Sequence, residues 1–346
     1  MSPKRISITR PDDWHLHLRD GAVLKDIVPH TAARFARAIV MPNLKPPVVN
    51  LAQARAYYQR ILEAVPSGPD FTPLMTLYLT EDTKAETIRA ASASGLVKAV
   101  KYYPAGATTN SEAGVRDLQR VYPLLEVMAE QELPLLVHGE VTDPQVDVFD
   151  REAVFIERLL LPLLQQIPEL KVVFEHITTA DAVELVQATP KNLAATITPQ
   201  HLLMNRNAIF QGGINPHHYC LPVLKREKHR KALVQAATGG DPRFFLGTDS
   251  APHGVSAKLS SCGCAGIYSA HAAIELYAQV FDAAGALDRL EAFASFHGAD
   301  YYGLPRNQTR ITLEKVTWTV PETLAFGSEQ LIPLYAGQRL NWRLKS

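Results

Sequence analysis

The chain has few cysteines, and their pattern excludes a disulfide framework. Its 346 residues include three, Cys220, Cys262 and Cys264. Three cysteines cannot build the paired network of a small secreted fold, so a reduced, cytoplasmic setting is expected. Cys262 and Cys264 are also closer in sequence than the ligands of most zinc–thiolate sites. We interpret that pair as part of a tight loop.

The chain also lacks an excess of charge and any long hydrophobic run. Lys+Arg and Asp+Glu each number 35, which gives a formal net charge of zero. No basic cluster indicates a nucleic-acid or membrane-surface partner. No apolar signal core follows Met1–Arg5, and the longest apolar runs, such as Leu159 to Leu164, are too short to span a bilayer. We therefore expect a small-molecule partner, with no nucleic acid and no membrane.

Alternating strand-like and helix-like segments are present throughout most of the chain. Hydrophobic residues make up 47% and charged residues 20%, as in globular proteins with a large core. Short β-prone segments predict eight strands: Asp13–Leu18, Ala38–Met41, Thr72–Leu79, Val97–Tyr103, Pro134–His138, Lys171–His176, Ala194–Ile197 and Phe244–Gly247. Longer segments predict eight helices: Val23–Phe35, Leu51–Ala64, Thr83–Ser94, Gly114–Glu132, Arg151–Ile167, Ala180–Gln187, Glu227–Thr238 and Ser269–Ala286.

This alternation predicts a parallel sheet, and eight units at this length predict a (β/α)8 TIM barrel. An open doubly wound sheet is the alternative, but no Gly-x-Gly-x-x-Gly follows the first strand. Residues 306–346 do not continue the alternation of strands and helices. We expect Ile332–Gly337 and Arg339–Leu344 to be short strands that pair with Arg5–Thr9 and close one end of the barrel. No linker rich in Gly, Ser or Pro interrupts the chain, so residues 1–346 are expected to form a single domain.

Polar residues follow several predicted strands, where barrel enzymes carry their chemistry. His15 and His17 lie two residues apart and would share one face of a strand. The polar residues at the ends of the predicted strands are His15, His17, Lys101, His138, His176 and Asp249. Each alone has a simpler interpretation: a core or loop histidine, an anion-binding lysine, or an aspartate that caps a turn. Together they would meet at one rim, where a divalent metal is the simplest partner for four imidazoles.

Histidine and carboxylate ligands suit Zn²⁺, with Mn²⁺, Fe²⁺ and Co²⁺ as alternatives. Four histidines and one aspartate exceed the needs of one tetrahedral ion with an open position, so two ions that activate a bridging water are expected. A second ion needs a bridging ligand, and we expect no spare Asp or Glu at a suitable strand end. As an ammonium, Lys101 would repel the metals, so it could contribute only if neutral or chemically modified.

The order and spacing of these residues resemble the amidohydrolase superfamily with a binuclear zinc centre. Within it, essentially the whole chain resembles the single-domain bacterial dihydroorotases. The similar stretches are Pro11–Arg19, Ala38–Asn43, Lys101–Asn110, Val137–Glu140, Phe174–Thr179, Ala195–His201, Leu246–His253 and Ser260–Gly266. The resemblance implies an enzyme of pyrimidine biosynthesis that interconverts L-dihydroorotate and N-carbamoyl-L-aspartate.

The resemblance also implies the roles of the metal ligands. Lys101 would be N-carboxylated by CO₂, and its carbamate would bridge two Zn²⁺ ions. His15, His17 and Asp249 would hold one zinc, and His138 and His176 the other. A bridging hydroxide would attack the ring amide, with Asp249 as general acid and base. A homodimer is implied as well.

The resemblance assigns the substrate contacts to other residues. Arg19, Asn43 and His253 would hold the substrate carboxylate, and backbone groups near Leu221 and Ala265 would meet the ring. The loop Pro104–Glu112 would fold over the substrate through Thr108 and Thr109. The alternative is an ordinary mobile surface loop, and Gly106 is expected to make the loop more flexible.

Two other functions are compatible with parts of the pattern. A hydantoinase or allantoinase would share the metal ligands but lack the combination of Arg19, Asn43 and His253. Such enzymes usually carry a flanking β-sandwich, for which this chain is expected to be too short. A metal-free barrel that serves as a scaffold belongs to a different class. The intact set of six metal-ligand positions argues against it.

Overall fold

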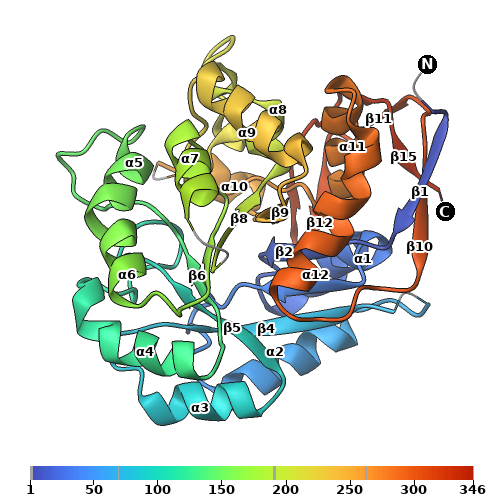
Figure 1. Ribbon diagram of the computed structural model, residues 1–346. Coiled ribbons are helices and arrows are strands. Elements are labelled where there is room, and N and C mark those ends of the chain that lie inside the picture. The colour runs from blue at the N-terminus through green and yellow to red at the C-terminus, as the bar shows by residue number, and fades with distance from the viewer. Residues whose placement is uncertain (1–2, 69, 190–191, 262, 346) are drawn as a thin grey trace.

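An eight-stranded parallel sheet forms the centre of the protein (Figure 1). The computed structural model describes residues 3–68, 70–189, 192–261 and 263–345. The strands are β2 (Asp12–Leu16), β3 (Arg37–Val40), β4 (Thr72–Tyr78), β5 (Val97–Tyr102), β6 (Leu135–Val137), β7 (Val172–Phe174), β8 (Leu193–Ile197) and β9 (Phe244–Leu246). Each pairs in parallel with the next one along the chain. All eight predicted strands are present, with small shifts in their ends.

The barrel closes between its first and last strands. Leu16 forms an isolated parallel bridge with Ser250. The backbone N–H of His17 donates to the Ser250 carbonyl at 3.1 Å, and the N–H of Asp249 donates to the His15 carbonyl at 2.9 Å. The predicted (β/α)8 architecture is therefore confirmed. The closure also places His15, His17 and Asp249 side by side.

Helices surround the sheet (Figure 1). They are α1 (Leu24–Arg34), α2 (Leu51–Glu63), α3 (Ala85–Ala93), α4 (Tyr122–Glu130), α5 (Arg151–Phe155), α6 (Leu161–Gln166), α7 (Ala180–Ala188), α8 (Pro199–Leu203), α9 (Glu227–Gly239), α10 (Val255–Lys258), α11 (Ala273–Ala283) and α12 (His297–Tyr301). Local sequence sets their ends: the Asn50 side chain caps α2 and Thr179 caps α7. Gly240, at a φ of 86°, follows the last turn of α9.

One predicted helix begins later than expected. The prediction spans Gly114–Glu132, whereas a 3-10 turn starts at Leu118 and α4 at Tyr122. The preceding residues are engaged elsewhere, because the Val115 N–H donates to the Tyr103 carbonyl and the Ala105 N–H donates to the Val115 carbonyl. Tertiary hydrogen bonding therefore overrides helical spacing here.

A segment that the sequence analysis did not predict fills the N-terminal end of the barrel. It consists of a π-helical turn over Ala292–Phe296 followed by α12. The Trp14 ring, on β2, stacks on Tyr302 with 4.6 Å between centroids. A Cβ added to Gly298 would lie 2.1 Å from Trp14 Nε1, so only glycine fits at that contact. With this end filled, the cavity described below lies at the other end of the strands.

Short antiparallel strands from both ends of the chain lie beside the barrel (Figure 1). They are β1 (Arg5–Thr9), β10 (Arg310–Glu314), β11 (Trp318–Thr319), β12 (Leu324–Phe326), β13 (Glu329–Leu331), β14 (Arg339–Leu340) and β15 (Arg343–Leu344). Two short strands, β14 and β15, lie within the expected segment Arg339–Leu344, but the expected pairing of β1 is wrong. β1 pairs with β10, which also pairs with β15. Ile332–Gly337 is not a strand; Pro333, which has no N–H, makes one isolated bridge.

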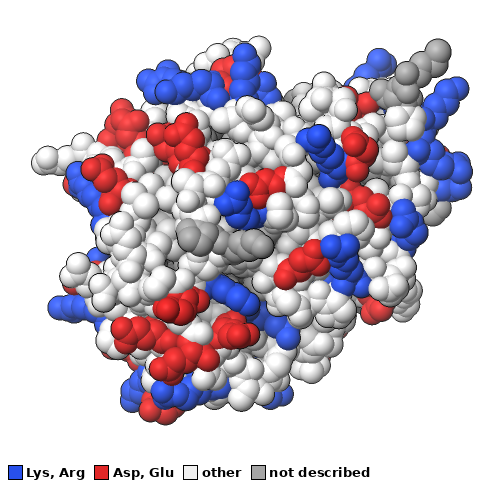
Figure 2. All heavy atoms as spheres, viewed as in Figure 1, with Lys and Arg blue, Asp and Glu red and all other residues white. Residues whose placement is uncertain are grey.

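The surface carries charges of both signs. On the face in view, basic and acidic side chains are interspersed (Figure 2), as the formal net charge of zero suggests. Within the described ranges, no helix has the length and apolar character needed to cross a membrane.

Candidate active site

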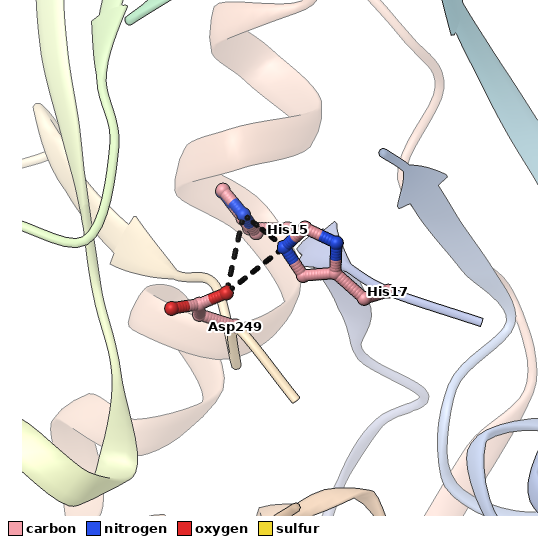
Figure 3. Close-up of side chains that lie close together, drawn as sticks. All are labelled: His15, His17 and Asp249. Carbon is pink, nitrogen blue, oxygen red and sulfur yellow. Dashed lines mark hydrogen bonds and ion pairs between the residues drawn. The ribbon is translucent and has the colours of Figure 1, made fainter. Parts of the chain in front are cut away.

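Three buried side chains meet where β2 and β9 close the barrel (Figure 3). Asp249 Oδ1 lies 3.4 Å from His15 Nε2 and 3.1 Å from His17 Nε2, and the two Nε2 atoms are 3.3 Å apart. A tetrahedral ion with ligands at about 2.0–2.1 Å has ligand–ligand distances of about 3.3–3.4 Å. The three atoms therefore fit three corners of a metal site. Across the described residues, no other group of three His, Cys, Asp or Glu ligand atoms is this compact.

Hydrogen bonds orient the His15 imidazole for this role. Its Nδ1 lies 2.8 Å from Glu175 Oε2, and Thr196 Oγ1 donates to the same oxygen at 2.6 Å. If Nδ1 carries the proton, the Nε2 lone pair faces His17 and Asp249, as in metal-bound histidines. Burial, reinforced by Lys101, holds the pKa of His15 well below its usual value. The imidazole is therefore neutral, which is the form that binds metals.

Three residues around the cavity have left-handed backbone conformations, which residues other than glycine rarely adopt. The φ angles are 56° at Arg19, 43° at His176 and 44° at Asp249. Each residue is held by a hydrogen bond to its main chain. The His176 N–H donates to Thr196 Oγ1 at 2.7 Å, and Tyr57 Oη donates to the Arg19 carbonyl at 2.5 Å. The Asp249 N–H is held by β2, as described above. Hydrogen bonds to neighbouring strands and helices thus hold these strained backbone conformations in place.

The rings of His176 and His138 follow that of His15 in a row of neighbouring imidazoles, and Lys101 is buried near them. The His176 ring lies between the His15 and His138 rings, with centroid distances of 4.9 and 4.8 Å. Lys101 is fully buried, and neither its Nζ nor His176 Nδ1 has a hydrogen-bond partner. Burial lowers the pKa of Lys101 to about 8. Polar atoms buried without partners are costly, so these atoms fit a site completed by a metal ion and by a group added to Lys101.

Two glutamates at strand ends also lie beside the histidines. Glu175 contacts His15, as described, and Glu140 Oε2 lies 2.8 Å from His138 Nε2. Carboxylates are therefore present at these strand ends, but each is bonded to an imidazole, so the expectation that none is free to bridge two metals stays a prediction. Each glutamate hydrogen-bonds one nitrogen of an imidazole, as carboxylates that orient metal-binding histidines do. Their positions in His138-x-Glu140 and Glu175-His176 are the signal that sequence reasoning missed.

Asp13 is a third buried carboxylate that sequence reasoning passed over. Its Oδ1 accepts from the N–H groups of His15 and Thr248, at 3.1 and 2.9 Å, and its Oδ2 accepts from Thr248 Oγ1 at 2.5 Å. These bonds connect β2 to the residues after β9. Asp13 therefore holds together the two segments that present the metal-binding triad.

The predicted substrate-binding residues surround one small cavity of about 20 Å³. Its lining includes His15, His17, Arg19, Asn43, Tyr103, Thr108, Thr109, His138, His176, Leu221, Asp249, Ala251, Ala265 and Gly266. His253 is next to it, with Nε2 2.8 Å from a terminal nitrogen of Arg19. The neighbouring Asp20 pairs with Arg60 instead, at 2.8 Å. Among the predicted residues, Lys101 and His253 are absent from the cavity lining. Tyr103, Ala251 and Gly266 line the cavity without having been predicted as site residues.

The loop Pro104–Glu112 covers the cavity in this structure. Thr109 Oγ1 donates to the Ala265 carbonyl at 3.2 Å, and Asn43 Nδ2 donates to the Thr109 carbonyl at 2.9 Å. Asn110 Nδ2 donates to the Asn43 carbonyl at 3.0 Å. Gly106, with a φ of 78°, forms the turn within the loop. The loop thus contacts residues on two sides of the cavity.

Comparison with known proteins matches this geometry. Residues 8–316 match the model of the amidohydrolase family. A dihydroorotase of Methylobacillus flagellatus is 65% identical over 340 residues, which cover 98% of this chain and 99% of the relative. The crystal structure of a dihydroorotase from Campylobacter jejuni is 37% identical, with a TM-score of 0.91 over 100% of this chain and 99% of that one.

A second solved structure agrees with the first. Dihydroorotase from Saccharomyces cerevisiae, in complex with 5-fluoroorotic acid, is 33% identical, with a TM-score of 0.91 over 99% of each chain. Both structures and the curated relative match nearly the whole chain at more than 30% identity. The chain belongs to the amidohydrolase family and, within it, to the dihydroorotases.

Proposed function

We propose that this chain interconverts L-dihydroorotate and N-carbamoyl-L-aspartate, a step of pyrimidine biosynthesis, at a centre that holds two Zn²⁺ ions. One observation carries the proposal. The compact triad of His15, His17 and Asp249 lines the same small cavity as Arg19, which offers a cation for a substrate carboxylate. The similarity to dihydroorotases over nearly the whole chain supports the choice of substrate.

Two ligand sets would hold the ions. His15, His17 and Asp249 would bind one, and His138 and His176 the other, with a carbamate on Lys101 shared by both. The buried, unpartnered Nζ of Lys101 supports this modification, because burial lowers its pKa to about 8 and so raises the fraction of neutral amine, which is the form that reacts with CO₂. When bound, the ions would supply an activated water and polarise the carbonyl that it attacks.

Asp249 is proposed to move the proton. Although burial acts to raise it, the pKa of Asp249 falls to about 2 because of its hydrogen bond with His17. The carboxylate is therefore ionised, which is the form needed to bind a metal and to take up a proton during the reaction. In hydrolysis, water oxygen bonds to the ring amide carbon, the carbon–nitrogen bond breaks, and the water's proton passes through Asp249 to the departing nitrogen. Cyclisation reverses these transfers.

Arg19, Asn43 and His253 are proposed to hold the substrate carboxylate. Arg19 already contacts His253, which keeps its guanidinium beside the cavity. The amide of Asn43 is bound to the Thr109 carbonyl in this structure, and this bond would exchange for one to substrate. Backbone groups of Leu221 and Ala265 would meet the ring. Substrate entry would then require the Thr108–Thr109 segment to open and close again as a lid.

The assay that tests this proposal compares two cyclic amides. L-Dihydroorotate and hydantoin are given to the same preparation, and its metal content is measured. We expect turnover of dihydroorotate, little turnover of hydantoin, and about two zinc ions per chain. Preferred hydrolysis of hydantoin would favour the alternative of a hydantoinase or allantoinase. Absence of bound metal and of turnover would favour a scaffold.

We also propose that residues 1–346 form a single domain that acts as a cytoplasmic homodimer. The continuous barrel, whose end is filled by α12, supports the single domain. The dimer and the location follow from resemblance to the family. Light scattering of the purified protein is expected to give about twice the chain mass of 38.2 kDa, and a mass of one chain would contradict the dimer.

A further inference from the structure

Lys258 is a buried lysine outside the metal centre. It ends α10 and is 4% exposed. Its Nζ donates to three backbone carbonyls, those of Tyr219 at 2.8 Å, Cys264 at 2.9 Å and Gly266 at 2.9 Å. Among the described residues no carboxylate pairs with it. An ammonium has three N–H donors, so these three carbonyls satisfy it completely.

The three carbonyls belong to the two segments that bring backbone to the cavity. Cys264 and Gly266 flank Ala265, and Tyr219 precedes Leu221 by two residues. Both Ala265 and Leu221 line the cavity. The Gly266 N–H also donates to the Tyr219 carbonyl at 3.0 Å, so the segments are joined directly as well as through Lys258.

The carbonyls around Ala265 show how Lys258 orients this backbone segment. Lys258 binds the carbonyls before and after Ala265, while the Ala265 carbonyl points the other way. There it meets His253 Nε2 at 3.0 Å and Thr109 Oγ1 at 3.2 Å. The lysine thus fixes which face of this peptide is turned toward the cavity.

We infer that Lys258 is a positioning residue for substrate binding, which holds the Ala265 backbone toward the cavity and ties it to the segment before Leu221. This inference rests on the proposed function, because it takes the cavity to be the dihydroorotate site. Burial lowers the pKa of Lys258 only to about 8, so the ammonium persists at neutral pH. Charge-assisted bonds to three carbonyls are stronger than neutral ones and suit a fixed geometry.

The test replaces the ammonium and separates binding from turnover. In Lys258→Met, the three carbonyls lose their donor, and we expect KM for dihydroorotate to rise roughly tenfold or more, while kcat per bound metal changes less. In Lys258→Arg, a planar guanidinium supplies a cation without the three-way geometry, so an intermediate KM is expected. If the Lys258→Met variant fails to fold, the Lys258→Arg variant alone tests the inference. Lys231→Met, at an exposed lysine of α9, is the matched control and should leave KM unchanged.

A second measurement does not depend on activity. Hydrogen–deuterium exchange is followed in segments 219–222 and 263–267 for all variants. Faster exchange in both segments of the Lys258 variants, with wild-type exchange in β2 and β9, is expected. Wild-type KM or unchanged exchange in folded Lys258 variants would overturn the inference. If the wild type turns over no dihydroorotate, the proposed function fails, while the exchange data still decide whether Lys258 holds the two segments.

Discussion

The Glu175 carboxylate lies 2.8 Å from Nδ1 of His15, across the barrel from the strand that carries the histidine. Glu175 is fully buried, and Thr196 also donates to it. The bond fixes the imidazole so that Nε2 faces His17 and Asp249. The orientation of the metal-binding triad therefore depends on a residue that does not itself belong to it.

Replacing Glu175 with glutamine should weaken metal binding without breaking the fold. Gln can still accept a hydrogen bond from His15, but it removes the negative charge that strengthens the imidazole as a ligand. We expect zinc affinity to fall about 10–100-fold, measured by competition with a chelator. Glu169→Gln, at an exposed position, is the control. Zinc affinity equal to the wild type would show that Glu175 does not tune this ligand.

Replacing Asp249 with asparagine should abolish proton transfer. The amide keeps an oxygen that faces His15 and His17, so zinc should remain largely bound. Loss of general acid–base catalysis is expected to lower kcat by roughly 10²–10⁴-fold. Turnover is measured per bound metal, with the exposed Asp288→Asn as the control. Full activity would remove Asp249 from the proton-transfer role.

Replacing Arg19 with methionine should weaken substrate binding far more than it disturbs the fold. The variant removes the cation proposed to hold the substrate carboxylate. A charge-assisted hydrogen bond contributes about 1.5–3 kcal/mol, so KM for dihydroorotate should rise about 10–100-fold. Steady-state kinetics and thermal unfolding are compared with those of the exposed Arg55→Met control. Unchanged KM and kcat would refute the carboxylate assignment.

Replacing Thr109 with valine should impair closure of the loop over the cavity. Valine keeps the shape of the side chain but loses the hydroxyl that donates to the Ala265 carbonyl. One neutral hydrogen bond contributes about 0.5–1.5 kcal/mol, so kcat/KM should fall about 2–10-fold. Thr72→Val, at an exposed position of β4, controls for the substitution itself. If kcat/KM matches the wild type, this hydroxyl plays no part in closure.

The barrel and the polar residues at its strand ends could be predicted from the sequence because both depend on local patterns. Apolar strands alternate with helical spacing, and His15, His17 and Lys101 are polar residues within or just after such strands. The ends of β2 through β9 then differ from prediction by at most two residues. Parallel strands bring their ends together whatever their distance in sequence, so the shared cavity also follows from the fold.

Other features depend on tertiary contacts that no local pattern encodes. Asp249 and His176 adopt positive φ angles because hydrogen bonds from neighbouring strands hold them there. The partner of Arg5–Thr9 is a segment about 300 residues away. Glu140 and Glu175 follow or precede ligand histidines, but their roles appear only when the side-chain directions are known.

The most direct test is a crystal structure of the zinc-loaded protein with N-carbamoyl-L-aspartate, with anomalous diffraction recorded at the zinc edge. The account predicts two anomalous peaks, one contacting His15, His17 and Asp249 and the other contacting His138 and His176. It also predicts a carbamate on Lys101 between them and the ligand's carboxylate on Arg19. A single peak with an unmodified Lys101, or a ligand carboxylate bound away from Arg19, would contradict it.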